Sequence, residues 1–205
     1  MNLLIVGAAG RTGRLLTELA LGRGHRVSAV VRSSPLTLPR VNLNLANLKI
    51  VNGDALNAAD MAAAIAGHDV IVSILGGRSK LNETLLEDAA AAMLAALRSE
   101  RLRRYIVVSS GLLFTSGSPV TAALRLVFKR AVADCTSMEN RVIASDALWT
   151  IVRPPRLTRG GASAYRAKVD ARPEGARSLT RATLAAFLLD EVETCRYPRS
   201  IVGLG

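Results

Sequence analysis

Three evenly spaced glycines near the start of the chain constrain its fold more than any other feature. They are Gly7, Gly10 and Gly13. An apolar run, 3–6, ends at the first of them, and beyond the last Leu15, Leu16 and Leu19 recur at helical spacing. This order is typical of a strand, a tight turn and the start of a helix. Such a turn can present backbone N–H groups and the positive end of a helix dipole to an anion.

The surrounding pattern favours a dinucleotide as that anion. A second apolar run, 27–31, follows the helical segment and completes a β-α-β unit. The spacing G-x-x-G-x-x-G differs from the G-x-G-x-x-G fingerprint, so the whole unit carries the prediction. A P-loop is disfavoured because no Gly-Lys-Ser/Thr follows the turn. The alternative is a glycine turn that only packs the helix on the strand.

The residue after the second apolar run bears on which nicotinamide dinucleotide is bound. An acidic residue there binds the ribose 2′-OH of NAD, whereas a basic one accommodates the 2′-phosphate of NADP. The residue is Arg32, and neither Asp nor Glu occurs from Leu19 through Gly53. Arg11, inside the glycine turn, can supply a second cation. We therefore expect NADP(H) in preference to NAD(H); the alternative is that both arginines are solvated surface charges.

Apolar runs and helical patterns continue to alternate along the chain. The runs are 48–51, 70–75 and 105–109, and helical segments at 58–66 and 85–97 separate them. This order predicts an α/β fold, a Rossmann-like doubly wound parallel sheet with helices on both faces. Ligands of such sheets lie beyond the carboxyl ends of the strands.

The rest of the chain completes one domain, 1–205. The sequence predicts a long helix to about residue 145 after Pro119, a strand at 149–152, a helix at 180–193 and a last strand around 201–202. Between them, 156–177 has little periodicity, and we expect it to be a small C-terminal excursion over the substrate side. Half of the 205 residues are apolar, which is enough for a sizeable core.

The composition bears on two questions, whether the chain has a metal site and where in the cell it acts. Cys135 and Cys195 form no C-x-x-C pair, and with two histidines in the chain we expect no metal site. No segment has the length and apolarity of a membrane helix, and the N-terminus lacks the basic region of a signal peptide. We therefore expect a cytoplasmic protein without a membrane partner, either a monomer or a weak homodimer.

The net charge of +11 sits mainly late in the chain. Between Arg153 and Arg181 there are eight basic residues against Asp170 and Glu174. Aromatic residues make up 3% of the chain, so there is no stacking platform for nucleic acid, and we expect none as a partner. An anionic small molecule or plain solubility explains the charge better.

Candidate site residues follow the predicted strands. Asp54 can accept a hydrogen bond from an adenine amino group, or it can cap the helix that begins near Ala58. Glycines after the fourth strand can let the chain pass the cofactor ribose, or form an ordinary turn. The cofactor-binding candidates are Gly7, Gly10, Arg11, Thr12, Gly13, Arg32, Asp54, Ala55, Leu75, Gly76, Gly77, Ser109 and Pro154.

Taken together, these motifs resemble those of the atypical short-chain dehydrogenase/reductase proteins, in the branch of biliverdin reductase B-like flavin reductases and NmrA-like proteins. The resemblance spans nearly the whole chain and rests on 7–13, 53–56, 107–111, 149–154 and 178–189. It implies a Rossmann fold, NADP at the carboxyl edge of the sheet, and a substrate pocket formed by the loops after Ser110 and Pro154.

One departure from the better-known short-chain dehydrogenases concerns mechanism. They use a Tyr-x-x-x-Lys pair, in which the lysine lowers the tyrosine pKa for proton transfer. Here the residues four beyond Tyr105, Tyr165 and Tyr197 are Ser109, Val169 and Ile201, so the pair is missing. Reduction of a ketone to an alcohol requires a placed general acid and is therefore disfavoured. Hydride transfer to a flavin, quinone or tetrapyrrole needs no such acid.

The leading hypothesis is an NADPH-dependent reductase of a conjugated, small-molecule acceptor. Ser110 is the catalytic candidate, and Ser110, Gly111 and Arg153 are the substrate-binding candidates, with Arg153 or a nearby arginine drawing in an anionic group. The alternative for Arg153 is that it satisfies buried carbonyls. A second hypothesis is an NmrA-type sensor that binds NADP(H) without turnover and acts through a protein partner. A sugar-nucleotide epimerase-like enzyme is disfavoured by the short chain.

Overall fold

The computed structural model describes residues 1–32, 36, 44–76, 84–98, 104–115 and 119–205. The helices are α1 (Arg11–Gly22), α2 (Ala58–Ile65), α3 (Leu85–Arg98), α4 (Pro119–Val127), α5 (Lys129–Ile143) and α6 (Arg181–Thr194), with 3-10 turns η1 (Leu45–Asn47) and η2 (Gly111–Leu113). None of the helices in these ranges is long and apolar enough to cross a membrane.

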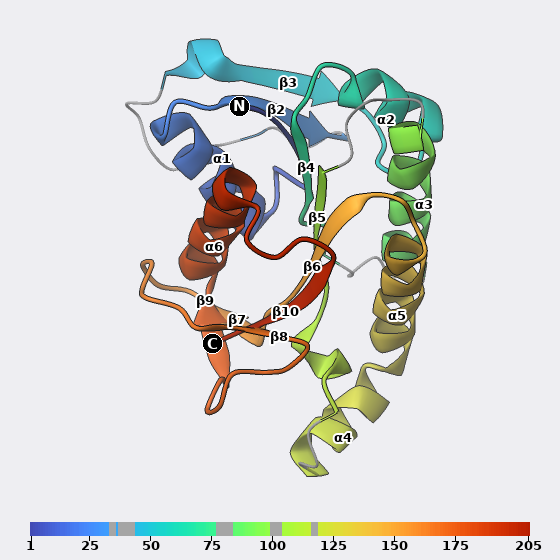
Figure 1. Cartoon of the computed structure of the whole chain (residues 1–205), viewed down its shortest axis with the longest axis vertical. Helices are drawn as coiled ribbons and strands as arrows, with labels where there is room; N and C mark the ends of the chain where they lie inside the picture. The colour runs from blue at the N-terminus through green and yellow to red at the C-terminus, as the bar shows by residue number, and fades with distance from the viewer. Residues whose placement is uncertain (33–35, 37–43, 77–83, 99–103, 116–118) are drawn as a thin grey trace.

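The strands are β1 (Asn2–Val6), β2 (Arg26–Val31), β3 (Leu48–Asn52), β4 (Val70–Ser73), β5 (Arg104–Val108), β6 (Leu148–Arg153), β7 (Arg156–Thr158), β8 (Ala167–Val169), β9 (Ser178–Thr180) and β10 (Ser200–Leu204). Among the described residues, eight strands form one sheet in the order β3-β2-β1-β4-β5-β6-β10-β8. All neighbours are parallel except β10 and β8. The predicted doubly wound Rossmann-like α/β fold is confirmed (Figure 1).

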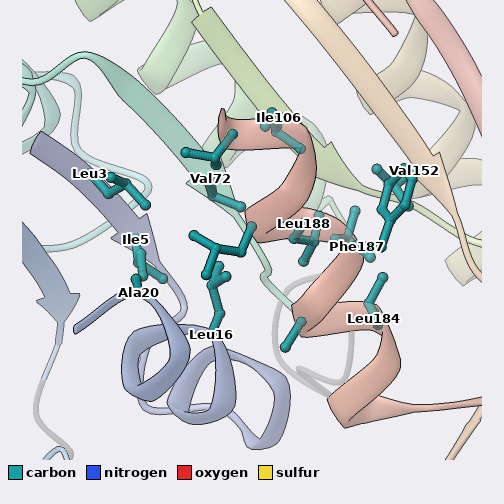
Figure 2. Close-up of a cluster of buried hydrophobic side chains, with 14 of the residues drawn as sticks. Leu3, Ile5, Leu16, Ala20, Val72, Ile106, Val152, Leu184, Phe187 and Leu188 are labelled. Carbon is teal, nitrogen blue, oxygen red and sulfur yellow. The ribbon is translucent and has the colours of Figure 1, made fainter. Parts of the chain in front are cut away.

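Helices cover both faces of the sheet, as Figure 1 shows. Side chains of one strand alternate between these two layers. Leu3 and Ile5 of β1 join the core under α1 and α6, with Leu16 and Phe187 from those helices (Figure 2). Leu4 of the same strand faces the opposite core, to which α2, α3 and α5 contribute. The central strands are apolar on both sides because both of their faces are buried.

The predicted helix over 119–145 is wrong in one respect: it is two helices. Phe128 has φ −102° and ψ 27°, outside helical geometry, and separates α4 from α5. Whereas α5 packs along α3, α4 contacts η2 and the start of α5. Thr121 is the buried residue of α4. The two segments therefore follow different surfaces, which helical periodicity alone does not reveal.

The excursion 156–177 has more regular structure than its sequence predicts. Its first residues form β7, which pairs with β9, and β8 pairs antiparallel with β10 at the edge of the main sheet. The backbones of Arg166 and Gly205 also exchange hydrogen bonds of 2.6 and 3.0 Å. Strands of three residues carry too little periodicity to be recognised, and their partners are distant in sequence.

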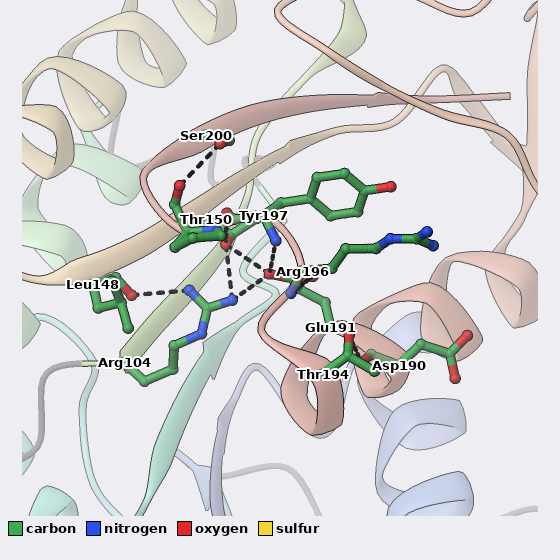
Figure 3. Close-up of polar contacts among 10 residues, drawn as sticks. Arg104, Leu148, Thr150, Asp190, Glu191, Thr194, Arg196, Tyr197 and Ser200 are labelled. Carbon is green, nitrogen blue, oxygen red and sulfur yellow. Dashed lines mark hydrogen bonds and ion pairs between the residues drawn. The ribbon is translucent and has the colours of Figure 1, made fainter.

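A buried ion pair ties α6 to the sheet at the amino ends of β5 and β6. The Arg104 guanidinium donates to the Glu191 carboxylate and, at 2.8 Å, to the Thr150 hydroxyl (Figure 3). Glu191, 1% exposed, also accepts from the backbone N–H groups of Arg196 and Tyr197, each at 3.1 Å. Because these bonds pair the two buried charges, the network positions α6 and the loop that leads to β10.

We expect Glu191→Ala to lower the free energy of unfolding by about 3–5 kcal/mol, because it leaves the Arg104 charge buried without a partner. The matched control is Glu193→Ala, two residues along the same helix. Glu193 pairs with Arg23 and His25 near the surface, so its loss should cost at most about 1 kcal/mol. Urea denaturation of both variants checks the difference, and equal losses would contradict the role of the network.

The close packing of α1 on β1 provides a second test. A Cβ built on Gly13 would lie 2.2 Å from the Gly7 carbonyl oxygen, whereas one on Gly22, in the same helix, meets nothing within 4 Å. Gly13→Ala should therefore lower the free energy of unfolding by about 1–3 kcal/mol. Gly22→Ala should leave it unchanged or raise it by about 0.5–1 kcal/mol. Thermal unfolding of both variants, followed by circular dichroism, measures the contrast.

Candidate functional site

The carboxyl ends of β1, β4, β5 and β6 meet at one edge of the sheet because these strands are parallel. The segments that leave them line two neighbouring cavities, of about 540 Å³ and about 220 Å³. Leu75, after β4, belongs to both. The predicted site residues therefore converge where an open parallel sheet binds its ligands.

The glycine turn after β1 brings the N-terminus of α1 to this edge. Gly7 has φ +89°, and a Cβ there would lie 2.7 Å from the Ile74 carbonyl oxygen. Its own carbonyl accepts the Gly10 N–H at 3.0 Å. Gly10 is the N-cap of α1 and provides no side-chain cap, and the first helical turn has no acidic residue. The first N–H groups of the helix thus face the larger cavity without a side-chain acceptor, as an anion site requires.

The larger cavity gathers residues from seven parts of the chain. It is lined by Gly10, Arg11, Thr12, Ile74, Leu75, Gly76, Leu86, Val108, Ser109, Ser110, Ala131, Asp134, Cys135, Pro154, Pro155, Leu157, Arg181 and Leu184. Eight of these are predicted site residues: Gly10, Arg11, Thr12, Leu75, Gly76, Ser109, Ser110 and Pro154. The wall combines apolar side chains with a few polar groups, the composition typical of a small-molecule site.

The smaller cavity holds the predicted residues of the first half of the sheet. It is lined by Val6, Gly7, Ala9, Val30, Val31, Arg32, Gly53, Asp54, Ala55, Leu56, Leu75 and Leu85. Arg32 stands exposed at the end of β2. The two cavities share Leu75, and residues of the glycine turn line both of them, so they adjoin at the carboxyl edge.

Asp54 does not cap α2, which was one of its two predicted roles. The N-cap is Asn57, whose side chain accepts from the N–H groups of Ala59 and Asp60. Asp54 instead accepts the N–H of Leu56 at 3.1 Å, in a turn of its own, and lines the smaller cavity. The predicted cap was misplaced by three residues because a local turn separates β3 from the helix.

The serines after β5 lie between the glycine turn and α5. The Ser110 hydroxyl accepts the N–H of Leu112 at 3.3 Å and so caps η2. Ser109 lies beside the Cys135 thiol. Burial raises the pKa of Cys135 to about 11, while the Ser109 hydroxyl acts in the opposite direction. The thiol is therefore protonated at neutral pH, and it lines the cavity as a small, weakly polar group.

Asp134 is a cavity residue that sequence reasoning missed. Its buried carboxylate accepts the N–H of Leu86 at 3.1 Å and that of Glu87 at 2.9 Å, and so caps the start of α3. Burial raises the pKa of Asp134, although these two backbone bonds oppose the shift. The cap joins residues 47 and 48 positions apart, so no local signal marks it.

Arg181 is the second missed residue with chemical consequence. It opens α6 and lines the larger cavity, where its guanidinium donates to the Thr158 carbonyl at 2.9 Å. Sequence reasoning placed it only in the basic excess of the C-terminal third. With Arg11 it gives the larger cavity two guanidinium groups.

Three predicted residues support the site without lining either cavity. Arg153 forms a two-bond ion pair with the buried Glu139 and stacks over Phe114, 4.8 Å from its ring centre. A Cβ on Gly111 would lie 2.6 Å from the Pro154 carbonyl oxygen, so Gly111 is a packing residue here. Gly13 packs α1 on the turn. Gly77, also predicted, lies outside the described residues.

No tyrosine lines either cavity in the described part of the chain. Tyr105 is fully buried in the core, and Tyr165 donates to Asp190 at 2.8 Å. The α5 residues that line the larger cavity four positions apart are Ala131 and Cys135. A Tyr-x-x-x-Lys pair is thus missing from this helix in space as well as in sequence, and small side chains occupy these two positions of the cavity wall.

Solved structures share this architecture. The oxidoreductase ylbE of Lactococcus lactis superposes with a TM-score of 0.81 at 20% identity, covering all of this chain and 90% of that one. A short-chain dehydrogenase/reductase of Veillonella parvula, in complex with NADP, gives a TM-score of 0.77 at 22% identity and covers all of this chain and 94% of that one. At these identities the likeness shows the fold.

Sequence comparison identifies the family. A protein described as probable pinoresinol-lariciresinol reductase 3, from Arabidopsis thaliana, is 30% identical over 85 residues, 42% of this chain and 28% of that protein. The isoflavone reductase homolog IRL of Zea mays is 30% identical over 93 residues, 43% of this chain and 30% of that protein. The match thus spans under a third of these relatives. The NAD(P)H-binding family matches residues 7–194, and the chain therefore belongs to this family.

Proposed function

We propose that the protein is an NADPH-dependent reductase that delivers a hydride to a planar, conjugated acceptor such as a flavin, a quinone or a tetrapyrrole. The observation that carries the proposal is the larger cavity. It lies beside the open N-terminus of α1 and is lined by Ser109, Ser110 and apolar side chains. A flat acceptor needs positioning against the nicotinamide more than it needs a strong acid.

The residues of both cavities fit an extended dinucleotide. The N–H groups at the start of α1 would hold the pyrophosphate, Asp54 and Ala55 the adenine side, and Ser109 and Pro154 the nicotinamide side. The fit rests on the turn at Gly7, which only a glycine accommodates, and on the uncapped helix start, which leave room and donors where a phosphate would lie. Once bound, NADPH supplies the hydride.

The two arginines of the dinucleotide site support NADP over NAD. Arg32 lines the smaller cavity and Arg11 the larger one. A guanidinium binds a phosphate through charge-assisted hydrogen bonds, whereas a ribose hydroxyl offers it no charge. We therefore assign the 2′-phosphate to Arg32, with Arg11 as its second cation.

Arg32→Ser should weaken NADPH binding about 10- to 100-fold, since charge-assisted bonds contribute about 1.5–3 kcal/mol. NADH binding should change by less than about threefold, because NADH lacks the phosphate. Arg26→Ser is the matched control, since Arg26 is exposed at the opposite end of the same strand. Titration calorimetry with both nucleotides measures the ratio; an equal loss for NADH would refute the assignment.

Within the larger cavity, we assign the orientation of the acceptor to Ser110. Arg181 is our candidate for an anionic group on the acceptor, because the Arg153 guanidinium is engaged by Glu139 and Phe114. Gly111 and Arg153 shape the pocket by holding the loop after Ser110 against the end of β6. The small side chains of Ala131 and Cys135 leave room in the cavity for an aromatic ring system. Solvent provides the proton that the reduced acceptor takes up.

The purified protein should oxidise NADPH when offered FMN, a small quinone or biliverdin, which absorbance at the NADPH band follows directly. Ser110→Ala should lower kcat/KM about 3- to 10-fold, the worth of one hydrogen bond. Ser200→Ala is the control, since its hydroxyl bonds the Pro198 carbonyl, remote from the site. Failure of the wild-type protein to bind NADPH would end the proposal.

The same assay decides a second candidate, an NmrA-type sensor that acts through a protein partner. The lack of a tyrosine and lysine pair on the described cavity wall favours it. A sensor would bind NADPH without oxidising it in the presence of any of the three acceptors. Whichever role holds, we expect a cytosolic monomer or weak homodimer, in keeping with two free cysteines.

A further inference from the structure

Helix α4 carries an apolar face that nothing in the described chain covers. Val120, Leu124 and Val127 recur at intervals of four and three residues, on one side of the helix, and Phe128 follows directly after its last residue. Val120 is 67% exposed and Val127 is 73% exposed, and Leu126 next to them is also 73% exposed. A contiguous group of exposed aliphatic side chains marks an interaction site on a folded protein.

The position of α4 makes this face accessible. In Figure 1 the helix lies at the end of the molecule farthest from β3, and it packs against η2 and α5. Thr121 is the one residue of this helix that is buried. The helix is thus held by one side, and its apolar side is directed outward.

The surroundings of the apolar face are positively charged. No acidic residue occurs between Tyr105 and Ala133, whereas Arg125, Lys129 and Arg130 lie on or next to the helix. The basic C-terminal third reaches the same end, because Arg172 donates to the carbonyl of Gly111 in η2 at 2.9 Å. Exposed aliphatic side chains and cations therefore share one end of the protein.

In place of the sequence-based expectation that the protein has no membrane partner, we propose that α4 is an interfacial helix that docks it on an anionic phospholipid surface. Aliphatic side chains enter the acyl boundary while neighbouring lysine and arginine side chains bind the lipid phosphates. Nucleic acid would use the cations but not the exposed leucine and valines. A second copy of this chain would bring two basic ends together, so like charges oppose self-association through α4.

Docking through α4 would also bring the larger cavity to the lipid. Ala131, three residues beyond Phe128, lines that cavity, and η2, against which α4 packs, follows directly after Ser110. The surface and the cavity are therefore neighbours in the fold. Lipid binding itself does not depend on the proposed reductase activity, and it is measured without cofactor or acceptor.

Co-sedimentation of the full chain with vesicles tests the proposal. Binding to phosphatidylcholine vesicles that contain phosphatidylglycerol should exceed binding to phosphatidylcholine alone by about tenfold or more, and high salt should remove the difference. The double variant Leu126→Ser/Val127→Ser should lower the partition coefficient about tenfold, because it removes two aliphatic side chains that would be partly buried in the lipid. Lys129→Gln should lower it about fivefold.

Ile50→Ser is the matched control, because Ile50 is 46% exposed on β3, at the other end of the sheet. It should bind vesicles as the wild-type chain does, and circular dichroism should show that all variants fold. Three outcomes would overturn the proposal: no binding of the wild-type chain to anionic vesicles, an equal loss in Ile50→Ser, or concentration-dependent self-association that disappears in the α4 double variant without any vesicle binding.

Discussion

Parallel pairing of β1 with β2 on one side and β4 on the other is the interaction on which the rest of the molecule depends. Leu3 pairs with Val27 and with Val70, and Val6 with Val30 and Ser73. Because the three strands run in the same direction, each needs a long crossover to the next, and all carboxyl ends reach the same edge. The register that buries both faces of β1 thereby also delivers the glycine turn, Leu75 and Arg32 to one site.

The stabilising ion-pair network and the candidate site lie at opposite ends of the strands. At the amino ends, the buried network of Arg104, Thr150 and Glu191 fastens α6 to β5 and β6. At the carboxyl ends, the same elements provide Ser109, Pro154 and Arg181 to the larger cavity. Backbone and side-chain groups bond both members of the ion pair, and neither Arg104 nor Glu191 lines the two cavities. At the opposite edge, the N-cap residue Gly10 provides no side-chain acceptor for the first N–H groups of α1.

Much of the fold could be predicted because its signals are local. The run 3–6, the three glycines and the leucines that follow specify a strand, a turn and a helix between residues 3 and 19, and the structure confirms all three. The break at Phe128 and the three-residue strands β7 and β8 were missed. Each depends on contacts with another segment of the chain, such as η2 for α4 or β10 for β8.

The candidate site divides in the same way. By itself, the sequence determined the α/β order and the residues that follow each strand. The alternation of apolar runs and helical patterns depends only on neighbouring residues, and the carboxyl ends of parallel strands lie at the same edge. Only the tertiary structure decided that Asp134 and Arg181 line the larger cavity and that Arg153 is paired with Glu139. These side chains meet partners 14 to 48 positions away, and contacts at that separation arise only when the sheet brings its helices together.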